Sequence, residues 1–175
     1  MTGDDLLGSR AMNHDVYTDD FILGVLGRVR TIAMVGASAN WNRPSFFAMK
    51  YLQQKGFRVI PVNPKEAGNT ILGEPAYASL KDVPGPFDMV DVFRGSEAAL
   101  AIVDEALALA KEKGIRVIWM QLGVRNDEAA ARAERAGLIV IMNRCPKIEF
   151  ARLHGELSWN GINSKVISSK RRKLA

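Results

Sequence analysis

The sequence predicts an α/β fold, a Rossmann-like three-layer domain with a mainly parallel sheet of about five strands. Two observations support this prediction. Short runs rich in Val and Ile recur along the chain, and the segments between them place apolar residues at helical spacing. Strands that are joined through helices run parallel, because each crossover returns the chain to the same end of the sheet.

The predicted strands are the apolar runs at residues 31–37, 58–63, 88–93, 116–123 and 138–143. Helices are expected between them. Pro44 opens a helix over residues 44–55, Ser96 is expected to cap a helix over 96–114, and Asn126 is expected to cap a helix over 126–137. A glycine stands at or just after the end of each segment, and glycine most readily adopts the left-handed conformation that ends a helix.

Two segments depart from this alternation. Residues 64–86 connect the second and third strands, are rich in proline and glycine, and contain only a short helix candidate at 79–83. Residues 19–28, before the first strand, have the spacing of an amphipathic helix. This helix could mediate dimerisation or pack on its own domain. We favour packing within the domain, because a terminal helix needs its apolar face covered.

The length of 175 residues favours one domain. We expect this domain at residues 18–153, after a mobile N-terminal segment at 1–17 and before a C-terminal extension at 154–175. Much of the net charge of +5 lies in the basic tail of this extension, which includes Lys170. The tail lacks the interleaved aromatic residues of a nucleic-acid platform, so nucleic acid is not an expected partner.

Three further classes of protein are disfavoured. The apolar runs are too short to span a membrane, and the acidic start of the chain does not resemble a signal peptide, so we expect a cytoplasmic protein. The single cysteine, Cys145, cannot form an internal disulfide. The 2 histidines, His14 and His154, lie far apart in the sequence and do not form a metal-ligand cluster.

The turn at residues 36–45 is typical of a phosphate-binding segment. A strand ends at Gly36 and a helix follows, so unpaired N–H groups and the helix dipole can stabilise an anion. The dinucleotide motif G-x-G-x-x-G is absent, because Ser38 and Trp41 replace its second and third glycines. The hydroxyls of Ser38 and Ser45 and the guanidinium of Arg43 could instead contact a phosphate. A solvated surface loop is the alternative.

The other predicted strands also end in polar segments, which a parallel sheet brings to one edge. Asn63 ends the second strand, where an NAD-binding protein commonly has an Asp or Glu that binds the ribose. Lys65 places positive charge where a phosphorylated ribose needs it, although a lysine at this position can equally be solvated. These residues favour a ligand with a phosphorylated ribose over NAD, whose ribose hydroxyls are not phosphorylated.

An ordered set of motifs resembles a known family. The set comprises VGAS and RPS in the phosphate turn, followed by PVNPKEAG, ILGEPAYASLKDVP, DMVDVFR, IWMQLGV and NRCPKIE. It is similar to the small bacterial CoA-binding proteins of the YccU-like group, which are related in fold to the N-terminal CoA domain of the succinyl-CoA synthetase alpha subunit. The resemblance spans about residues 18–153 and implies a Rossmann-type domain that binds coenzyme A or an acyl-CoA.

The resemblance also implies where the cofactor-binding residues lie. The phosphate-side loop comprises Gly36, Ala37, Ser38, Arg43, Pro44 and Ser45. The remaining groups are Asn63, Pro64 and Lys65 beside the adenosine, Val92, Phe93 and Arg94 as the wall after the third strand, and Leu122 and Gly123 near the pantetheine arm. Many relatives have an Asp where this chain has Asn143, so no role is carried over to that position.

No catalytic constellation is evident in the sequence. Catalysis in the ligase relatives needs a phosphorylated histidine in a second domain and a nucleotide-binding partner subunit, and we expect this chain to end before such a domain. His14 and His154 lack an adjacent partner typical of a general base, so we expect exposed or structural roles for both.

Non-catalytic binding of CoA is the leading hypothesis. An NAD(P)-binding oxidoreductase with an atypical phosphate loop is the alternative, and a scaffold that has lost its ligand is a weaker one. Self-association or a protein partner stays open.

Cys145 follows the fifth predicted strand, at the edge where the ligand is expected. Arg144 and Lys147 could lower the pKa of its thiol, which would then react with the sulfur of CoA under oxidation. Alternatively, Cys145 is a small buried residue that packs at the end of the sheet, and we favour this second interpretation.

Overall fold

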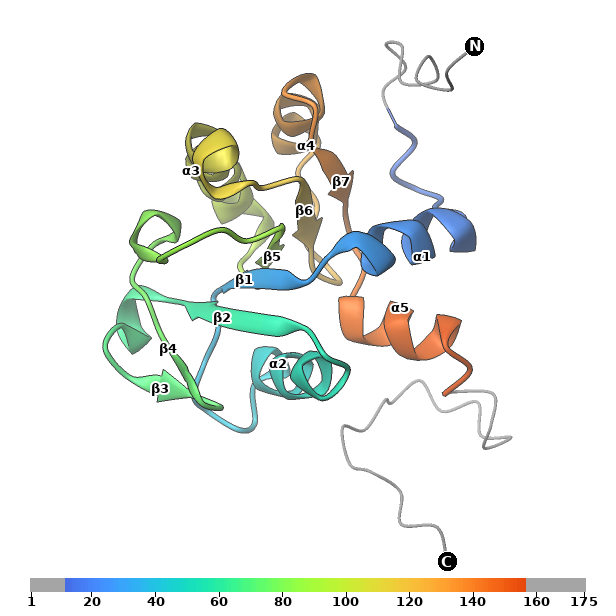
Figure 1. Cartoon of the computed structure of the whole chain (residues 1–175). Coiled ribbons are helices and arrows are strands. Elements are labelled where there is room, and N and C mark those ends of the chain that lie inside the picture. The colour runs from blue at the N-terminus through green and yellow to red at the C-terminus, as the bar shows by residue number, and fades with distance from the viewer. Residues whose placement is uncertain (1–11, 157–175) are drawn as a thin grey trace, which may run out of the picture.

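The computed structural model describes residues 12–156 (Figure 1). In this part of the chain, five parallel strands form one sheet in the order β2-β1-β5-β6-β7. The strands are β1 (Thr31–Val35), β2 (Arg58–Val62), β5 (Met89–Val92), β6 (Val117–Met120) and β7 (Ile139–Ile141). Each strand lies within one of the predicted apolar runs, so the predicted α/β fold with a parallel sheet is confirmed.

Helices cover both faces of the sheet and make the fold three-layered (Figure 1). One face is covered by α1 (Asp19–Arg28), α2 (Pro44–Gln54) and α5 (Pro146–Leu153), and the other by α3 (Ser96–Lys113) and α4 (Asp127–Arg135). The sequence analysis did not predict α5. This helix has 8 residues, too few for a clear apolar period, and it begins soon after the last strand.

Alternate residues of the central strand β5 face the two apolar layers. Val90 and Val92 pack in the cluster beneath α3 and α4, whereas Met89 packs in the cluster beneath α1, α2 and α5. Asp91 therefore points toward the second layer, where it is fully buried. A carboxyl group in this position has little water to solvate its charge.

The connection from β2 to β5 is irregular, as expected. It contains two 3₁₀ turns, η1 (Pro64–Glu66) and η2 (Leu80–Asp82), the second within the predicted segment 79–83. It also contains a two-stranded ribbon, β3 (Thr70–Ile71) and β4 (Glu74–Pro75), that we did not predict. Leu72 and Gly73 connect these strands with φ angles of 48° and 85°, as in a tight hairpin turn. Strands of 2 residues are too short to leave an alternating pattern in the sequence.

One predicted helix cap is confirmed and one is wrong. The side-chain oxygen of Asn126 accepts the N–H of Ala129 at 2.9 Å and so caps α4. Ser96 does not cap α3, because Gly95 precedes the helix at the cap position. The Ser96 hydroxyl instead accepts the N–H of Arg125 at 3.0 Å. This bond joins the loops that follow β5 and β6.

The N-terminal part of the described chain packs on the domain. Ile22, Val25 and Leu26 of α1 are buried in the second layer, so the preferred prediction of packing within the domain is confirmed. Residues before α1 pack as well, since the Tyr17 hydroxyl accepts the N–H of Met142 at 2.8 Å. The chain therefore contacts the domain at Tyr17, before the domain boundary predicted at residue 18. Lys170 and the basic tail lie outside the described residues.

Candidate functional site

The loops that follow the five parallel strands meet at the carboxyl edge of the sheet. Strand β1 has β2 on one side and β5 on the other. The helices that follow β1 and β5, α2 and α3, cover opposite faces. The loops after β1 and β5 therefore diverge at this point, and open α/β sheets commonly bind ligands at such a divergence.

Gly36 brings the loops after β1 and β5 into contact. Its φ angle is +89°, which disfavours any residue with a side chain. A Cβ atom at this position would lie 2.3 Å from the backbone oxygen of Phe93 and 3.1 Å from the Cδ of Arg94. Only glycine therefore allows this close approach, which holds Arg94 beside the phosphate-type loop.

The loop between β1 and α2 leaves the start of α2 without a side-chain cap. Arg43 occupies the cap position, but its side chain makes no capping hydrogen bond. Ser38 and Asn40 instead bond within the loop, since Ser38 Oγ accepts the N–H of Asn40 at 3.1 Å and Asn40 Oδ1 accepts the N–H of Asn42 at 3.0 Å. Pro44 has no N–H, and the N–H of Phe46 bonds to the Arg43 carbonyl at 3.0 Å, so within the described residues the N–H of Ser45 is left at the positive end of the helix dipole. Ser45, in the first turn, is buried.

Asn63, at the end of β2, holds the neighbouring loop in place. Its side chain is 8% exposed, its Nδ2 donates to the backbone oxygen of Ala37 at 2.8 Å, and its Oδ1 accepts the N–H of Lys65 at 3.1 Å. Both polar atoms of the amide are therefore occupied by the protein. Asn63 positions the loop, while Pro64 and Lys65 are exposed beside it.

Glu66 makes a second contact with the same loop, which sequence reasoning missed. Its Oε1 accepts the backbone N–H of Ala39 at 3.0 Å. Glu66 is half-buried and lies in η1, three residues after Asn63. No local pattern in the sequence distinguishes this glutamate, because its partner is 27 residues away along the chain.

The predicted residues after β5 and β6 divide into buried and exposed ones. Val92, predicted as part of the ligand wall, is fully buried in the layer beneath α3 and α4, so its side chain packs in the core. An inward-facing strand residue packs in the core even at the end of a strand. Arg94 and Leu122 are exposed, with Leu122 exposed to 63%. Phe93 is partly buried.

Asn143 has a structural role that the sequence left open. Its side-chain oxygen accepts the N–H of Gly123 at 2.7 Å, and its φ angle is 54°, a left-handed conformation that asparagine tolerates better than most residues. The bond ties the loop after β6 to the loop after β7. Gly123 is therefore held in place at the edge, next to the exposed Leu122.

Three cationic side chains at this edge have no partner among residues 12–156. Arg43, Lys65 and Arg94 form neither an ion pair nor a side-chain hydrogen bond within the described part of the chain. Elsewhere, Arg116 pairs with Asp88 and Arg132 pairs with Asp104. Unpaired cations in neighbouring loops at one edge, together with an uncapped helix start, produce a positive potential, which favours a phosphorylated or carboxylated ligand.

Beneath this edge lies a buried carboxyl group, Asp91. The side-chain amide of Gln121 donates to Asp91 Oδ1 at 2.8 Å, whereas Asp91 Oδ2 has no hydrogen-bond partner among the described residues. Burial raises the pKa of Asp91 to about 7, and the Gln121 hydrogen bond opposes this rise. Asp91 can therefore hold a proton near neutral pH.

Cys145 lies partly buried at the start of α5. Burial raises the pKa of its thiol to about 11, and the charge of Asp91 adds to this rise, while the N–H groups of Ile148 and Lys147 and the charge of Lys147 only partly oppose it. Lys147 does lower this pKa, but burial outweighs it, so the suggestion that neighbouring cations favour the thiolate is wrong. The alternative, a structural cysteine, agrees with the burial.

The two histidines have different surroundings, and the Nδ1 of His14 lies 2.8 Å from the Tyr17 hydroxyl, which accepts the N–H of Met142 just after β7. His14 is buried, and its Nε2 lies 2.9 Å from Glu134 Oε1 on α4. His154 is exposed at the end of α5, where its ring stacks on Phe150 at 3.8 Å. Within residues 12–156 no three His, Cys, Asp or Glu side chains are grouped as a metal site requires.

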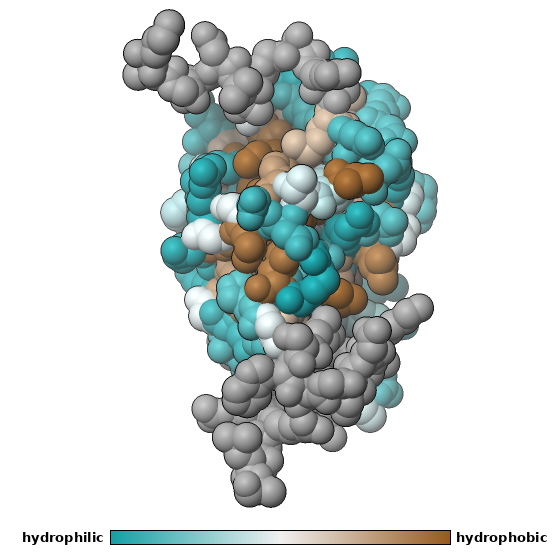
Figure 2. Space-filling view, turned by 90° about the vertical axis from the view of Figure 1, so that its right-hand side faces the viewer, coloured by the Kyte–Doolittle hydropathy of each residue, from teal (hydrophilic) through white to brown (hydrophobic). Residues whose placement is uncertain are grey.

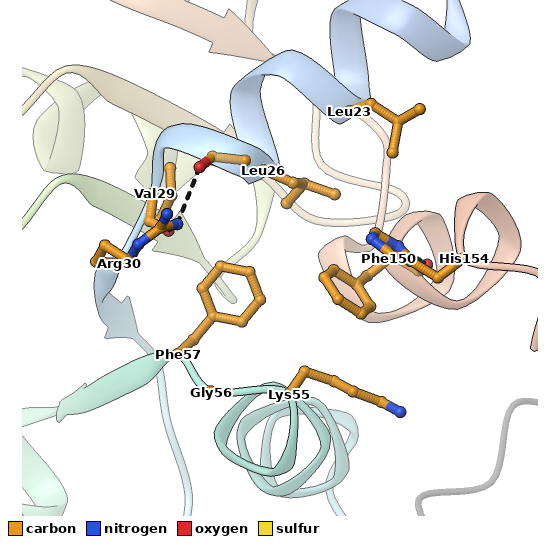
Figure 3. A pocket seen from close by; sticks show the side chains of 10 residues that line it. Leu23, Leu26, Val29, Arg30, Lys55, Gly56, Phe57, Phe150 and His154 are labelled. Atoms are coloured by element: carbon orange, nitrogen blue, oxygen red, sulfur yellow. Dashed lines mark hydrogen bonds between the residues drawn. The ribbon is translucent and has the colours of Figure 1, made fainter.

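A hollow of about 330 Å³ lies at the opposite, amino-terminal edge of the sheet (Figure 3). Leu26, Phe57 and Phe150 form its apolar wall, and Figure 2 shows apolar residues gathered among hydrophilic ones on the side of α1 and α5. Its cations already have partners, because Arg30 donates to the backbone oxygens of Gly27 and Val29, and Lys55 pairs with Glu156. The unpaired charges thus favour the carboxyl edge as the site for an anion.

The model of the CoA binding domain family matches residues 30–151. The chain belongs to this family. The match contains all of the strand-end loops described above and confirms the family resemblance. In the described part of this CoA-binding-domain protein, no helix has the length and apolar character needed to cross a membrane.

Relatives of this CoA-binding-domain protein include chains that are matched over most of their length and one region of a longer enzyme. The uncharacterized protein YneT of Bacillus subtilis is 39% identical over 127 residues, which cover 73% of this chain and 90% of YneT. A hypothetical protein from Pyrococcus horikoshii has a similar structure, with a TM-score of 0.73 and 38% identity over 84% of this chain and 99% of that chain. The ADP-forming acetate–CoA ligase II of Archaeoglobus fulgidus is 33% identical over 89 residues, which cover 50% of this chain and 12% of the ligase.

Proposed function

We propose that this protein binds coenzyme A or an acyl-CoA, without catalysis, at the carboxyl edge of its sheet. The observation that supports this most directly is that Arg43, Lys65 and Arg94, all unpaired within the described residues, lie in the loops after β1, β2 and β5 at one edge of the sheet, where α2 starts without a side-chain cap. CoA is a polyanion whose phosphates suit such a site. Membership of the CoA-binding domain family supports the same ligand.

Each part of the edge has a place in this proposal. The loop from Gly36 through Ser38 to Ser45 binds phosphate with backbone N–H groups, hydroxyls and the Arg43 guanidinium. Pro64 and Lys65 lie beside the adenosine, and Phe93 and Arg94 form the facing wall. Leu122 and Gly123 lie beside the pantetheine arm, where an exposed leucine can cover an apolar chain.

The absence of catalysis is part of the proposal. A nucleophilic cysteine needs a thiolate, and the raised pKa of Cys145 disfavours one. His14 is buried against Glu134 and Tyr17, and His154 lies just after α5 at the amino-terminal edge of the sheet. These residues support a binding role, and turnover of a CoA thioester by the purified protein would contradict it.

Calorimetric titration of the ligand-free protein with CoA and with NAD tests the ligand. We expect CoA to bind more tightly, because the residue that ends β2 is the neutral Asn63, whose amide is occupied, and Lys65 is exposed beside it. Tighter binding of NAD would refute the proposal. It would favour an NAD(P)-binding oxidoreductase with an atypical phosphate loop.

The substitution Arg43→Ala tests where the phosphates lie. Loss of a charge-assisted hydrogen bond should weaken CoA binding by about 1.5–3 kcal/mol, while the exposed side chain contributes little to the fold. Arg135→Ala is a matched control, since Arg135 is exposed at the end of α4 and also lacks a partner within residues 12–156. Equal affinities of the two variants for CoA would place the phosphates elsewhere.

A further inference from the structure

The described structure places a carboxylate on the loop that is proposed to bind phosphate. Glu66 Oε1 accepts the N–H of Ala39 at 3.0 Å, within the turn between β1 and α2. A backbone N–H in such a turn is also a group that a phosphate oxygen could use. The protein therefore supplies its own negative charge at one end of its anion-binding loop.

Glu66 contacts one end of this loop, and the start of α2 lies at the other end. Arg43 and Ser45 lie at the start of α2, whereas Ala39 lies on the side of the loop that contacts the end of β2. Lys65, the residue before Glu66, is exposed and without a partner within residues 12–156. A cationic and an anionic residue are thus adjacent in the chain after β2, next to the loop that leads to α2.

We propose that Lys65 and Glu66 together determine which group the site accepts at the adenosine end of the ligand. This inference rests on the proposed binding of CoA. The Lys65 ammonium attracts a phosphate on the ribose, while the Glu66 carboxylate repels it and instead accepts a hydrogen bond from a ribose hydroxyl. CoA carries a 3′-phosphate that dephospho-CoA lacks. The ratio of the affinities for these two ligands therefore reports the balance of the two opposing effects.

Glu66 also has a positioning effect, and the two effects can be separated. Glutamine can still accept the N–H of Ala39 through its side-chain oxygen, but it carries no charge. Alanine removes both the acceptor and the charge. Glu66→Gln therefore changes the electrostatics and preserves the contact that holds the loop, whereas Glu66→Ala loses both.

The test is calorimetric titration of CoA and dephospho-CoA into the parent protein and its variants. At low ionic strength, Glu66→Gln should raise the ratio of CoA affinity to dephospho-CoA affinity by about threefold or more, and Lys65→Ala should lower it by a similar factor. Both changes should shrink in high salt, because these groups are solvent-accessible. Glu112→Gln is the control, since Glu112 is 72% exposed near the end of α3 at the other edge of the sheet.

The outcomes separate this inference from the proposed function. If the parent protein binds neither ligand, the proposed function fails. If it binds CoA and Glu66→Gln leaves the affinity ratio unchanged or lowers it, the selectivity role of Glu66 is overturned while CoA binding stands. If Glu66→Ala weakens both ligands equally and Glu66→Gln matches the parent, Glu66 only positions the loop, which also overturns the inference.

Discussion

Asp91 should make the stability of the protein depend on pH. It lies on the central strand β5 between Met34 of β1 and Trp119 of β6, and it is fully buried. Only one of its oxygens has a hydrogen-bond partner within the described residues, the amide of Gln121. The charged form of this carboxyl is therefore poorly solvated in the folded protein.

The direction of the effect follows from the raised pKa. Burial raises the pKa of Asp91 from 3.8 to about 7, so in this interval the folded protein holds a proton that the unfolded chain has released. The contribution of Asp91 to the free energy of unfolding then falls as the pH rises from about 4 to about 7. A pKa change of this size corresponds to a loss of about 4 kcal/mol from this one group.

The substitution Asp91→Asn isolates this contribution. Asparagine stays neutral and can still accept the Gln121 hydrogen bond through its side-chain oxygen. Urea unfolding, followed by circular dichroism at pH 5 and pH 8, should show a smaller loss of stability at the higher pH in the variant than in the parent. Asp20→Asn, at an exposed position of α1, controls for the removal of a carboxylate. Parallel pH profiles for parent and Asp91→Asn would refute the reasoning.

Two further predictions concern Gly36 and Cys145. Gly36→Ala should lower the free energy of unfolding by at least about 2 kcal/mol, because a positive φ and a close approach to Phe93 both disfavour a side chain. Gly85→Ala, at φ +76° with no atom within 4 Å of its Cβ position, should cost less in the same urea titration, and an equal cost would contradict the contact with Phe93. Cys145, the single cysteine, should react with a disulfide reagent at pH 8 at least about tenfold more slowly in the folded protein than in urea, because its pKa is about 11. Equal rates would show an accessible, reactive thiol.

The strands could be predicted because burial on both faces makes them continuous apolar runs. The cap at Asn126 was also predictable, since its acceptor and the N–H of Ala129 lie three residues apart. Ser96 has the same local signature, but a donor from a distant loop, the N–H of Arg125, engages its hydroxyl. A local pattern cannot indicate such a competing partner.

The same distinction applies to the candidate site. The sequence indicated which loops lie at the carboxyl edge, because that follows from parallel strands alone. It did not show that Asn63 uses its amide to hold Ala37, that Glu66 contacts Ala39, or that Val92 faces the core. These facts depend on how segments far apart in the chain pack, and they determine which side chains remain free for a ligand.

The packing of the N-terminal segment has a consequence for dissecting the protein. The family match begins at residue 30, yet α1 lies before that point and buries Ile22, Val25 and Leu26 against the sheet. A fragment cut at the family boundary would expose this apolar surface and leave the N–H of Met142 without the Tyr17 hydroxyl. Recombinant fragments for ligand studies should therefore retain the chain from residue 12 onward, because the folding unit is larger than the segment by which the family is identified.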